Sequence, residues 1–125
     1  MTDPTAEFFG ELSERGHEPL LEKASGTLRF DLVDGKRTDR WLVTVRKGDV
    51  GVSRRNMRAD CVIRTNRALF DGLASGKVNM MAAVLRGAMG VEGAVELLVL
   101  FQRLFPGPPR SRSWRHTAGY ARRQA

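Results

Sequence analysis

The sequence predicts an α+β domain in which five strands form one sheet and about five helices cover one face of it. Alternating apolar and polar residues recur between residues 26 and 65, which is the pattern of half-buried strands. Apolar residues with helical spacing occur before that region and again after it. A chain of 125 residues, 42% hydrophobic and 28% charged, has the size and composition of one folded domain.

The chain begins with a predicted helix. Asp3 followed by Pro4 is typical of a helix cap and first turn, so we expect a helical region from Asp3 to Leu21. Its apolar stripe consists of Phe8, Phe9 and Leu12. Its acidic face, which we expect to be solvated, consists of Glu7, Glu11, Glu14 and Glu18. Gly16 and Pro19 predict a break, with a short second helix over residues 20–24.

Four strands are expected next, as an antiparallel meander with one apolar face. The alternating segments are GTLRFDLVDG (26–35), DRWLVTVRK (39–47), a short piece around Val50 and Val52, and ADCVIRT (59–65). Turns are marked by Asp34-Gly35 and Lys47-Gly48. One face of this sheet suits water, so the other has to be covered by the rest of the chain.

Three further helices supply that cover. Asn66 and Asn79 are typical N-cap residues and predict helices over residues 66–75 and 79–86. Another helix is predicted from Ala94 to Phe105, and Pro106 ends it. Between them lies GAMGVEG (87–93), which we interpret as a fifth, edge strand because its glycines lower helix propensity and permit sharp corners.

The last helix, AVELLVLFQRLF, has more apolar surface than one face of a small sheet requires. Its polar side chains are limited to Glu96, Gln102 and Arg103, whereas a surface helix normally has a wide polar face. Flexible methionines occur earlier in this half, at positions 80, 81 and 89. Three interpretations stay open here: an ordinary core helix, a homodimer interface, and a lid over an internal apolar cavity for a lipid.

The positive charge is concentrated at the C-terminus. The net charge is +7, but residues 1–105 contain 16 Lys and Arg against all 14 Asp and Glu. Residues 106–125 contain five arginines and no acid, so we divide the chain into a domain (1–105) and a basic Arg/Pro/Ser-rich tail (106–125). Trp114 and Tyr120 lie among these arginines, a composition that suits solvation, an anionic membrane surface or a single-stranded nucleic acid. Solvation is the plainest of the three, and nucleic acid is not the partner we expect.

Several classes of protein do not fit the sequence. The longest apolar run, LLVLF (97–101), is too short to cross a bilayer, and the acidic N-terminus does not resemble a signal peptide, so we expect a cytoplasmic location. A single cysteine, Cys61, leaves no disulfide and no Cys-cluster metal site. The histidines, His17 and His116, have no nucleophile motif beside them. We therefore expect neither an enzyme nor a bound metal or cofactor.

Short motifs follow one another along the chain in a fixed order. They are Gly26-Thr-Leu-Arg-Phe30, Trp41 within DRWLVTV, Lys47-Gly48-Asp49, Ala59-Asp60-Cys61-Val62-Ile63, Gly76-Lys77, a helix with Met80, Met81 and Ala83, and Gly87-x-Met89-x-Val91-x-Gly93. In this order, over roughly residues 7–105, they resemble the sterol-carrier-protein type 2 domain, a small lipid-binding fold. The sequence departs from that family at Ala88 and Gly90, where the fifth strand usually has basic residues, and in the arginine-rich tail.

The resemblance implies a mixed, mainly antiparallel sheet, with helices on one face and an apolar tunnel between the two layers. The tunnel lining implied by position is Phe70, Leu73, Met81, Val84, Leu85, Met89, Val91, Leu98, Phe101 and Phe105. The implied function is non-enzymatic binding, and intracellular transfer, of a sterol, fatty acid or fatty acyl chain. The alternatives are a homo-oligomeric or partner-binding module with the last helix as interface, and a nucleic-acid-binding protein that acts through its tail. A monomer and a homodimer both stay open.

Overall fold

The structure, a computed structural model, describes residues 3–106. The helices are α1 (Pro4–Arg15), α2 (Arg67–Ala74), α3 (Met80–Leu85) and α4 (Val95–Phe101), with two 3-10 helices, η1 (Pro19–Leu21) and η2 (Gln102–Leu104). The strands are β1 (Ser25–Asp34), β2 (Arg37–Arg46), β3 (Asp49–Ser53), β4 (Cys61–Asn66) and β5 (Gly90–Gly93). This confirms the predicted α+β class. All of the predicted tail beyond Pro106 lies outside the described residues.

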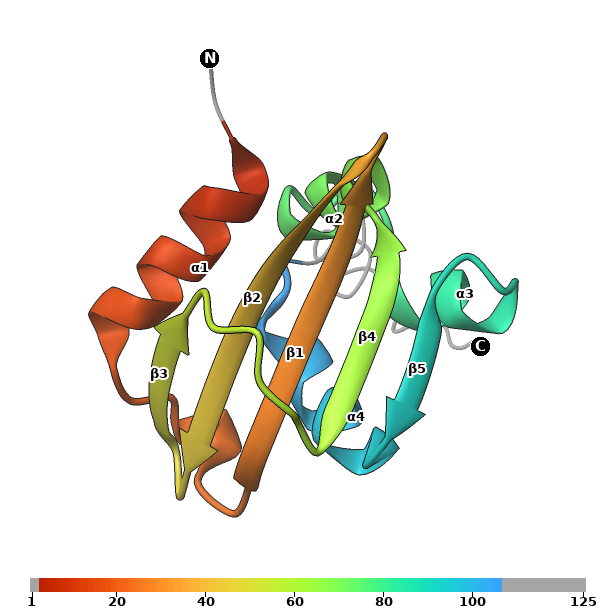
Figure 1. Cartoon of the computed structure of the whole chain (residues 1–125). Coiled ribbons are helices and arrows are strands. Elements are labelled where there is room, and N and C mark those ends of the chain that lie inside the picture. Colours follow the sequence, from red (N-terminus) through yellow and green to blue (C-terminus); the bar gives the residue numbers. More distant parts are fainter. Residues whose placement is uncertain (1–2, 107–125) are drawn as a thin grey trace, which may run out of the picture.

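The five strands form one mixed sheet in the order β3-β2-β1-β4-β5 (Figure 1). Strands β1 and β2 form an antiparallel hairpin that runs from Ser25 opposite Arg46 to Asp34 opposite Arg37. Strand β4 pairs parallel to β1, whereas β3 and β5 pair antiparallel to their neighbours at the two edges. The sheet is therefore mixed and mainly antiparallel, as the family resemblance implied.

The predicted four-strand antiparallel meander is wrong at its last strand. The segment from Arg54 to Asp60 does not turn back beside β3; it crosses the open face of the sheet, so that β4 starts at the same end as β1 (Figure 1). Seven extended residues reach about 23 Å, which is enough to return along a strand. The crossing is held by hydrogen bonds, since the Thr27 amide donates to Asp60 Oδ2 at 2.9 Å and Arg29 donates to Met57 O at 3.0 Å.

Helices α1, α2 and α3 begin where the sequence places caps. The side-chain oxygens of Asp3, Asn66 and Asn79 each accept from the backbone N–H three residues later, at 3.1, 2.7 and 2.9 Å. Helix α1 ends at Gly16, whose φ is +67°, and the predicted second helix is only the short turn η1. In Figure 1, α2 and α4 lie behind the sheet, α1 lies on the β3 side and α3 lies beyond β5.

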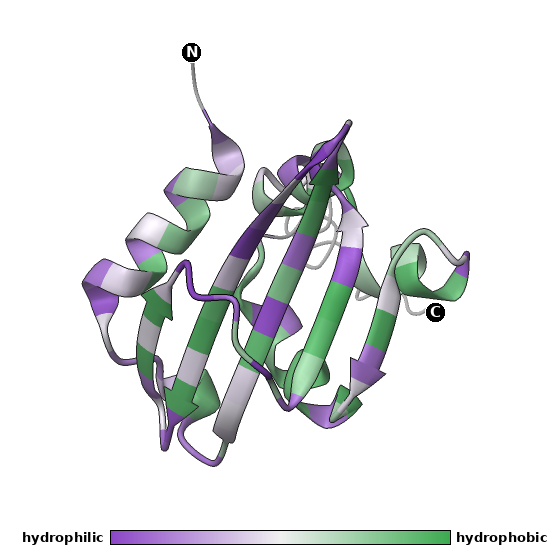
Figure 2. Ribbon diagram, viewed as in Figure 1, coloured by the Kyte–Doolittle hydropathy of each residue, from purple (hydrophilic) through white to green (hydrophobic). Residues whose placement is uncertain are grey.

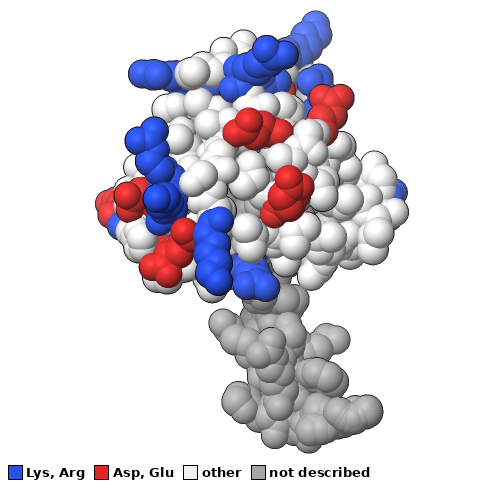
Figure 3. Space-filling view, turned by 90° about the horizontal axis from the view of Figure 1, so that it is seen from below, with Lys and Arg blue, Asp and Glu red and all other residues white. Residues whose placement is uncertain are grey.

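The two faces of the sheet differ in chemistry, as the alternating pattern predicts. Phe30, Val43 and Ile63, on the face toward the helices, are fully buried. Arg29 and Arg64 lie on the opposite face, and hydrophilic and hydrophobic positions accordingly alternate along the strands in Figure 2. Figure 3, seen from below, shows Lys and Arg side chains gathered along its upper edge, which is the open face of the sheet. The core therefore lies between the sheet and the helices, which is the layer that the predicted tunnel would occupy.

The glycine-rich stretch before the last helix does contain the predicted edge strand. Only its second half, Gly90–Gly93, is paired with β4, because residues 86–89 still belong to the turn after α3. Gly93 has a φ of +94°, and a Cβ atom there would lie 2.1 Å from the carbonyl oxygen of Asp60. Only glycine fits this corner without moving the backbone.

Candidate functional site

A cluster of aromatic rings lies between the sheet and the helices. This set, named the aromatic layer below, consists of Phe8, Phe9, Phe30, Trp41, Phe70, Phe101 and Phe105. The Phe9 ring stacks on Trp41 and on Phe70, with centroids 4.6 and 5.5 Å apart. Phe30 and Phe101 meet at 5.3 Å. Such contacts add stability beyond the buried area alone, so the layer is a packed apolar interior.

Beside this layer, an open groove of about 870 Å³ lies between α1, the end of α2 and the segment around η2. Its lining residues are Pro4, Glu7, Phe8, Glu11, Glu14, Arg15, Ala74, Ser75, Leu104 and Pro106. The floor is apolar and the α1 rim is acidic, because Glu7, Glu11 and Glu14 recur at helical spacing and are all exposed. We call this feature the α1 groove.

Phe8 belongs to both the α1 groove and the aromatic layer. It lines the groove, yet it is only 8% exposed because its ring stacks on Phe105, with centroids 4.6 Å apart and planes 7° apart. Phe105 also meets Phe70 at 5.5 Å and Phe101 at 5.7 Å, both edge to face. The stacked pair Phe8–Phe105 therefore separates the groove from the interior.

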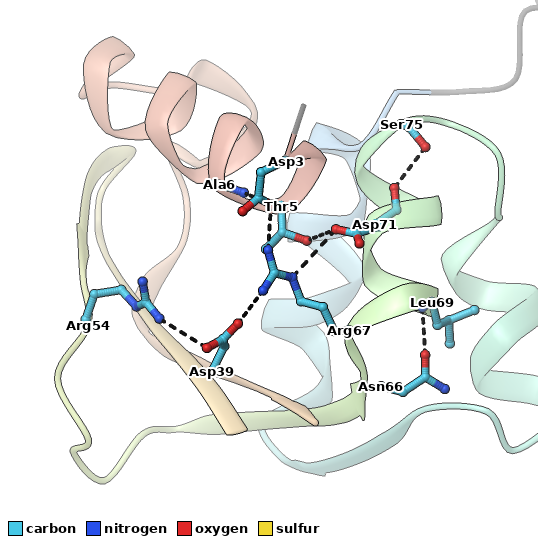
Figure 4. A network of polar contacts seen from close by, with 10 residues as sticks. All are labelled: Asp3, Thr5, Ala6, Asp39, Arg54, Asn66, Arg67, Leu69, Asp71 and Ser75. Carbon is cyan, nitrogen blue, oxygen red and sulfur yellow. Dashed lines mark hydrogen bonds and ion pairs between the residues drawn. The ribbon is translucent and has the colours of Figure 1, made fainter. Parts of the chain in front are cut away.

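A polar network fixes the start of α1 above this layer (Figure 4). Arg67, the first residue of α2, donates to Asp3 Oδ1 at 2.6 Å and to the carboxylate of Asp39 on β2. Thr5 Oγ1 donates to Asp71 Oδ1 at 2.6 Å, which ties α1 to α2 a second time. The Arg67 guanidinium holds the pKa of the Asp3 carboxyl below its ordinary value. The network thus positions α1 against both α2 and the sheet.

Two titratable groups outside this network also have a perturbed pKa, and neither lines the α1 groove. Burial raises the pKa of the Cys61 thiol, which is fully buried and so behaves as a small apolar group. The pKa of His17 is raised above its ordinary value, mainly because its Nδ1 lies 2.8 Å from Asp49 Oδ1. Within residues 3–106, no three His, Cys, Asp or Glu side chains gather closely enough to hold a metal ion.

Family comparison matches residues 8–106 to the SCP-2 sterol transfer family. The chain belongs to this family. The family that the ordered motifs between Gly26 and Gly93 suggested is therefore confirmed. No helix in the described part of this SCP-2 chain has the length and apolar character needed to cross a membrane.

Solved SCP-2 structures share the fold. The sterol carrier protein domain 2 of Helicoverpa armigera matches with a TM-score of 0.65 and 21% identity, over 81% of this chain and 84% of that one. Sterol carrier protein 2 of Aedes aegypti, in complex with the C16 fatty acid palmitate, matches with a TM-score of 0.63 and 18% identity, over 85% and 100%. The sec-alkylsulfatase Pisa1 from Pseudomonas sp. matches with a TM-score of 0.64 and 22% identity, over 80% of this chain but 16% of that enzyme. Comparison with curated protein sequences found no match.

The ten residues implied as the SCP-2 tunnel lining fall into three groups. Those buried in the core are Phe70, Leu73, Met89, Leu98 and Phe101. Those half-buried at its margin are Val84, Val91 and Phe105. Those exposed to solvent are Met81, at 37%, and Leu85, at 84%. Eight of the ten thus lie in or against the layer between sheet and helices.

One detail of the expected SCP-2 site needs correction. Met81 and Leu85 do not line an internal space in this structure, because Met80 and Ala83 take the inward positions of α3 and are 3% and 0% exposed. Helical spacing then turns positions 81 and 85 outward. The tunnel itself stays a prediction, and packed rings lie in the layer where it is expected. The α1 groove lies beside that layer, and none of the ten residues lines it.

Sequence reasoning missed the groove residues as part of the site. The stripe of Phe8, Phe9 and Leu12 indicates a buried helix face, but not which ring would border a groove. Ala74 and Leu104 come from segments far along the chain, and no local pattern places them beside α1. Only the packing of three separate segments creates this feature.

Proposed function

We propose that this SCP-2 domain binds one apolar lipid, a sterol, fatty acid or fatty acyl chain, between its sheet and its helices, and carries it without chemical change between intracellular membranes. Family membership supports the proposal, and the palmitate complex of the Aedes aegypti protein supports the ligand class. One structural observation carries it. Phe8 lines an open groove and stacks on Phe105, which contacts the rings of the apolar interior.

Because the aromatic layer is packed, a lipid enters only if side chains yield space. Phe105 is the ring best placed to move, since it is half-buried, lies at the end of η2 and is followed by Pro106. Its turning outward would join the α1 groove to the layer. The lipid chain would then lie along Phe70, Leu98 and Phe101, where it gains about 25 cal/mol for each square ångström of apolar surface removed from water.

The rim of the groove refines the ligand class. Glu7, Glu11 and Glu14 would face a polar head group left at the groove, and Arg15 is the only basic lining residue within residues 3–106. A carboxylate head would be repelled by three glutamates, whereas a hydroxyl head would accept and donate hydrogen bonds. We therefore infer that neutral lipids, such as a sterol or a fatty alcohol, bind more tightly than a fatty acid of equal chain length.

Lipid uptake by the delipidated full chain tests this proposal. A fluorescent sterol, a C16 fatty alcohol and palmitate would be titrated separately, and native mass spectrometry would give the stoichiometry. We expect a one-to-one complex, with the neutral lipids bound more tightly. Phe105→Ala should accelerate uptake, whereas the control Leu104→Ala, which changes a groove residue outside the stacked pair, should leave the rate near that of the unaltered chain.

Three results would contradict the carrier proposal or its details. If none of the three lipids binds, the aromatic layer is an ordinary hydrophobic core and not a lipid-binding site. Tighter binding of palmitate than of the alcohol would remove the proposed role of the acidic rim. Equal acceleration by the two alanine variants would show that the Phe8–Phe105 pair is not the entrance.

Transient contact with an anionic membrane through residues 106–125 is a further part of the proposal, supported by the five arginines of that segment. Deleting residues 106–125 should weaken binding to anionic vesicles and leave lipid occupancy intact. Equal vesicle binding by the two chains at low salt would contradict it. The nucleic-acid alternative depends on the same arginines and likewise falls outside the described residues.

One observation favours a second candidate function, a homodimer or partner interface on α4. Val95 and Val99 on its outer side are 50% and 43% exposed, although helices usually turn such residues inward. Sedimentation of the lipid-free protein distinguishes the candidates. A dimer that Val99→Asp converts to a monomer would support the interface, whereas a stable monomer at all concentrations would exclude self-association through α4.

A further inference from the structure

Among the four α-helices of the described chain, α3 alone has no polar side chain. Its sequence is MMAAVL, and it lies beyond the β5 edge of the sheet, where Figure 2 shows it in hydrophobic colours. Met80 and Ala83 point inward, with 3% and 0% exposure. Met81 and Leu85, one helical turn apart, point outward with 37% and 84% exposure. Helix α3 is therefore apolar on both faces, and its outer ridge has no cover in the described chain.

The surroundings of this ridge are basic. Residues 72–91 include Lys77 and Arg86, both exposed, and no acidic residue. Arg64 of β4 is also exposed and lies opposite Gly90, where β5 begins. None of these three cations forms an ion pair within residues 3–106. The acidic residue of β5, Glu92, lies toward the other end of that strand.

We propose that α3 docks on an anionic lipid bilayer. Leu85 and Met81 enter the head-group region, while Lys77, Arg86 and Arg64 lie against lipid phosphates. Apolar side chains flanked by basic ones are the chemistry of an interfacial membrane contact. The inference rests on the proposed carrier function, because a carrier has to meet a membrane to load or release its lipid.

The size of the ridge favours a bilayer over a folded protein partner. A stable protein interface buries about 800 Å² on each side, far more than two exposed side chains on a six-residue helix provide. A bilayer needs no complementary pocket, and two apolar side chains with three cations suffice for reversible attachment. Docking through α3 does not depend on whether a lipid occupies the interior, so docking and lipid binding can be measured separately.

A fluorescent label at position 85 tests the proposal directly. Cys61 is the single cysteine and is fully buried, so Leu85→Cys in the full chain can be labelled selectively with an environment-sensitive dye. Leu20→Cys is the matched control, since Leu20 is an exposed leucine (46%) on η1. With vesicles of phosphatidylcholine and phosphatidylglycerol at about 3:1, emission at position 85 should shift to the blue and rise, while emission at position 20 should not. No shift at position 85, or an equal shift at both positions, would overturn the proposal.

Vesicle partitioning gives the second measurement. Leu85→Ser should lower the partition coefficient about tenfold and Leu20→Ser should not change it, since one fully inserted leucine contributes that factor. The double variant Arg64→Gln/Arg86→Gln should lose more than about tenfold on anionic vesicles and nothing on phosphatidylcholine alone. The charge-matched control Lys36→Gln/Arg37→Gln, at the β1–β2 turn, should retain binding. Unchanged partitioning of Leu85→Ser would overturn the proposal.

The failure of docking and the failure of the carrier function are distinguishable. Lipid affinity, measured without vesicles, should be the same for Leu85→Ser and the unaltered chain. If no lipid binds but the label at position 85 still responds to vesicles, the carrier function fails and the docking surface stands. If lipid binds and the label does not respond, docking through α3 fails and the carrier function stands.

Discussion

On the β2–β3 side of the sheet, α1 is fixed by stacked rings and by ion pairs, whereas on the β5 side α3 is fixed mainly by Met80 and Ala83. Aromatic rings and the Arg67 network join α1, α2, β1 and β2 into one unit, named the rigid half below. Residues 71–100, in contrast, contain no aromatic residue and include four glycines after α2, at positions 76, 87, 90 and 93. Residues 76–93, which contain these four glycines, are called the β5 edge below.

The difference between the rigid half and the β5 edge indicates which part of this SCP-2 domain is most stable and which part can adjust its shape. Rings packed face to face and edge to face hold one geometry, so the rigid half specifies the fold. Methionine side chains are flexible and fill spaces of varied shape, so the β5 edge can adjust to a lipid or a membrane surface. Four comparisons of variants would break or sharpen this contrast.

The largest expected effect comes from removing a ring of the rigid half. Phe70→Ala should lower the free energy of unfolding by about 3–5 kcal/mol, because a fully buried ring leaves a cavity among four other rings. Met80→Ala at the β5 edge should cost nearer about 2 kcal/mol, since its surroundings can collapse into the space. Urea unfolding of both variants measures the difference. An equal loss, or a larger one for Met80→Ala, would end the distinction between the two regions.

The second comparison uses two glycines of the β5 edge that share a positive φ. Gly93→Ala forces a Cβ to within 2.1 Å of a backbone oxygen, whereas at Gly87 nothing lies within 4 Å of the added atom. Gly87→Ala should therefore cost only the strain of its backbone angle, about 1 kcal/mol, and Gly93→Ala at least about 2 kcal/mol. Thermal unfolding measures both. Similar melting temperatures for the two variants would show that β5 can shift to accommodate a Cβ atom at position 93.

The third comparison concerns the network that positions α1. Arg67→Met should cost about 1–2 kcal/mol near neutral pH, because Asp3 and Asp39 lose a shared charged donor. The folded-state pKa of Asp3 is lowered, so its contribution is present above the unfolded-state pKa and is lost as the pH falls through the folded-state value. The stability of the unaltered chain should thus decline below about pH 4 more steeply than that of Arg67→Met. If the stability of the two chains falls in parallel as the pH decreases, the Asp3–Arg67 pair does not contribute to the pH dependence of stability.

The smallest expected effect concerns the other end of α1, where His17 joins the rigid half to β3. The pKa of His17 is raised by Asp49, so the pair stabilises the fold below the unfolded-state pKa and loses this effect as the pH rises through the folded-state value. Asp49→Asn should return the pKa of His17 toward its ordinary value, with little change in stability because the pair is exposed. NMR titration of the ring protons measures the shift. An unchanged pKa in Asp49→Asn would mean that the two side chains do not pair in solution.

The sequence predicts where the helices and strands of this fold lie along the chain better than it predicts which of them pair and pack together. The caps Asp3, Asn66 and Asn79 and the glycines around β5 act locally, so local patterns suffice to place the helices and the edge strand. The parallel pairing of β4 with β1 depends on the path of residues 54–60 over the sheet, which alternation does not encode.

The candidate site was predictable only in part, for the same reason. Burial of Phe70 follows from the helical spacing of Leu69, Phe70 and Leu73 among polar neighbours. The outward position of Leu85 does not, because every residue of α3 is apolar and its periodicity gives no preferred face. Arg67 joins carboxylates that lie 64 and 28 residues away in the sequence, and the α1 groove joins three segments, so both exist only in the folded chain.

Trp41 gives the aromatic layer a built-in optical signal. Its indole lies between the Phe9 ring, at 4.6 Å, and the Arg54 guanidinium, whose central carbon is 4.0 Å from the ring. Because an indole's emission depends on the polarity and charge of its surroundings, any rearrangement of Phe9 changes the colour and intensity of Trp41 fluorescence. With Trp114 replaced by Phe, Trp41 is the single tryptophan of the chain. The arrival of a lipid can then be timed in a stopped-flow instrument, with no label on either the protein or the lipid.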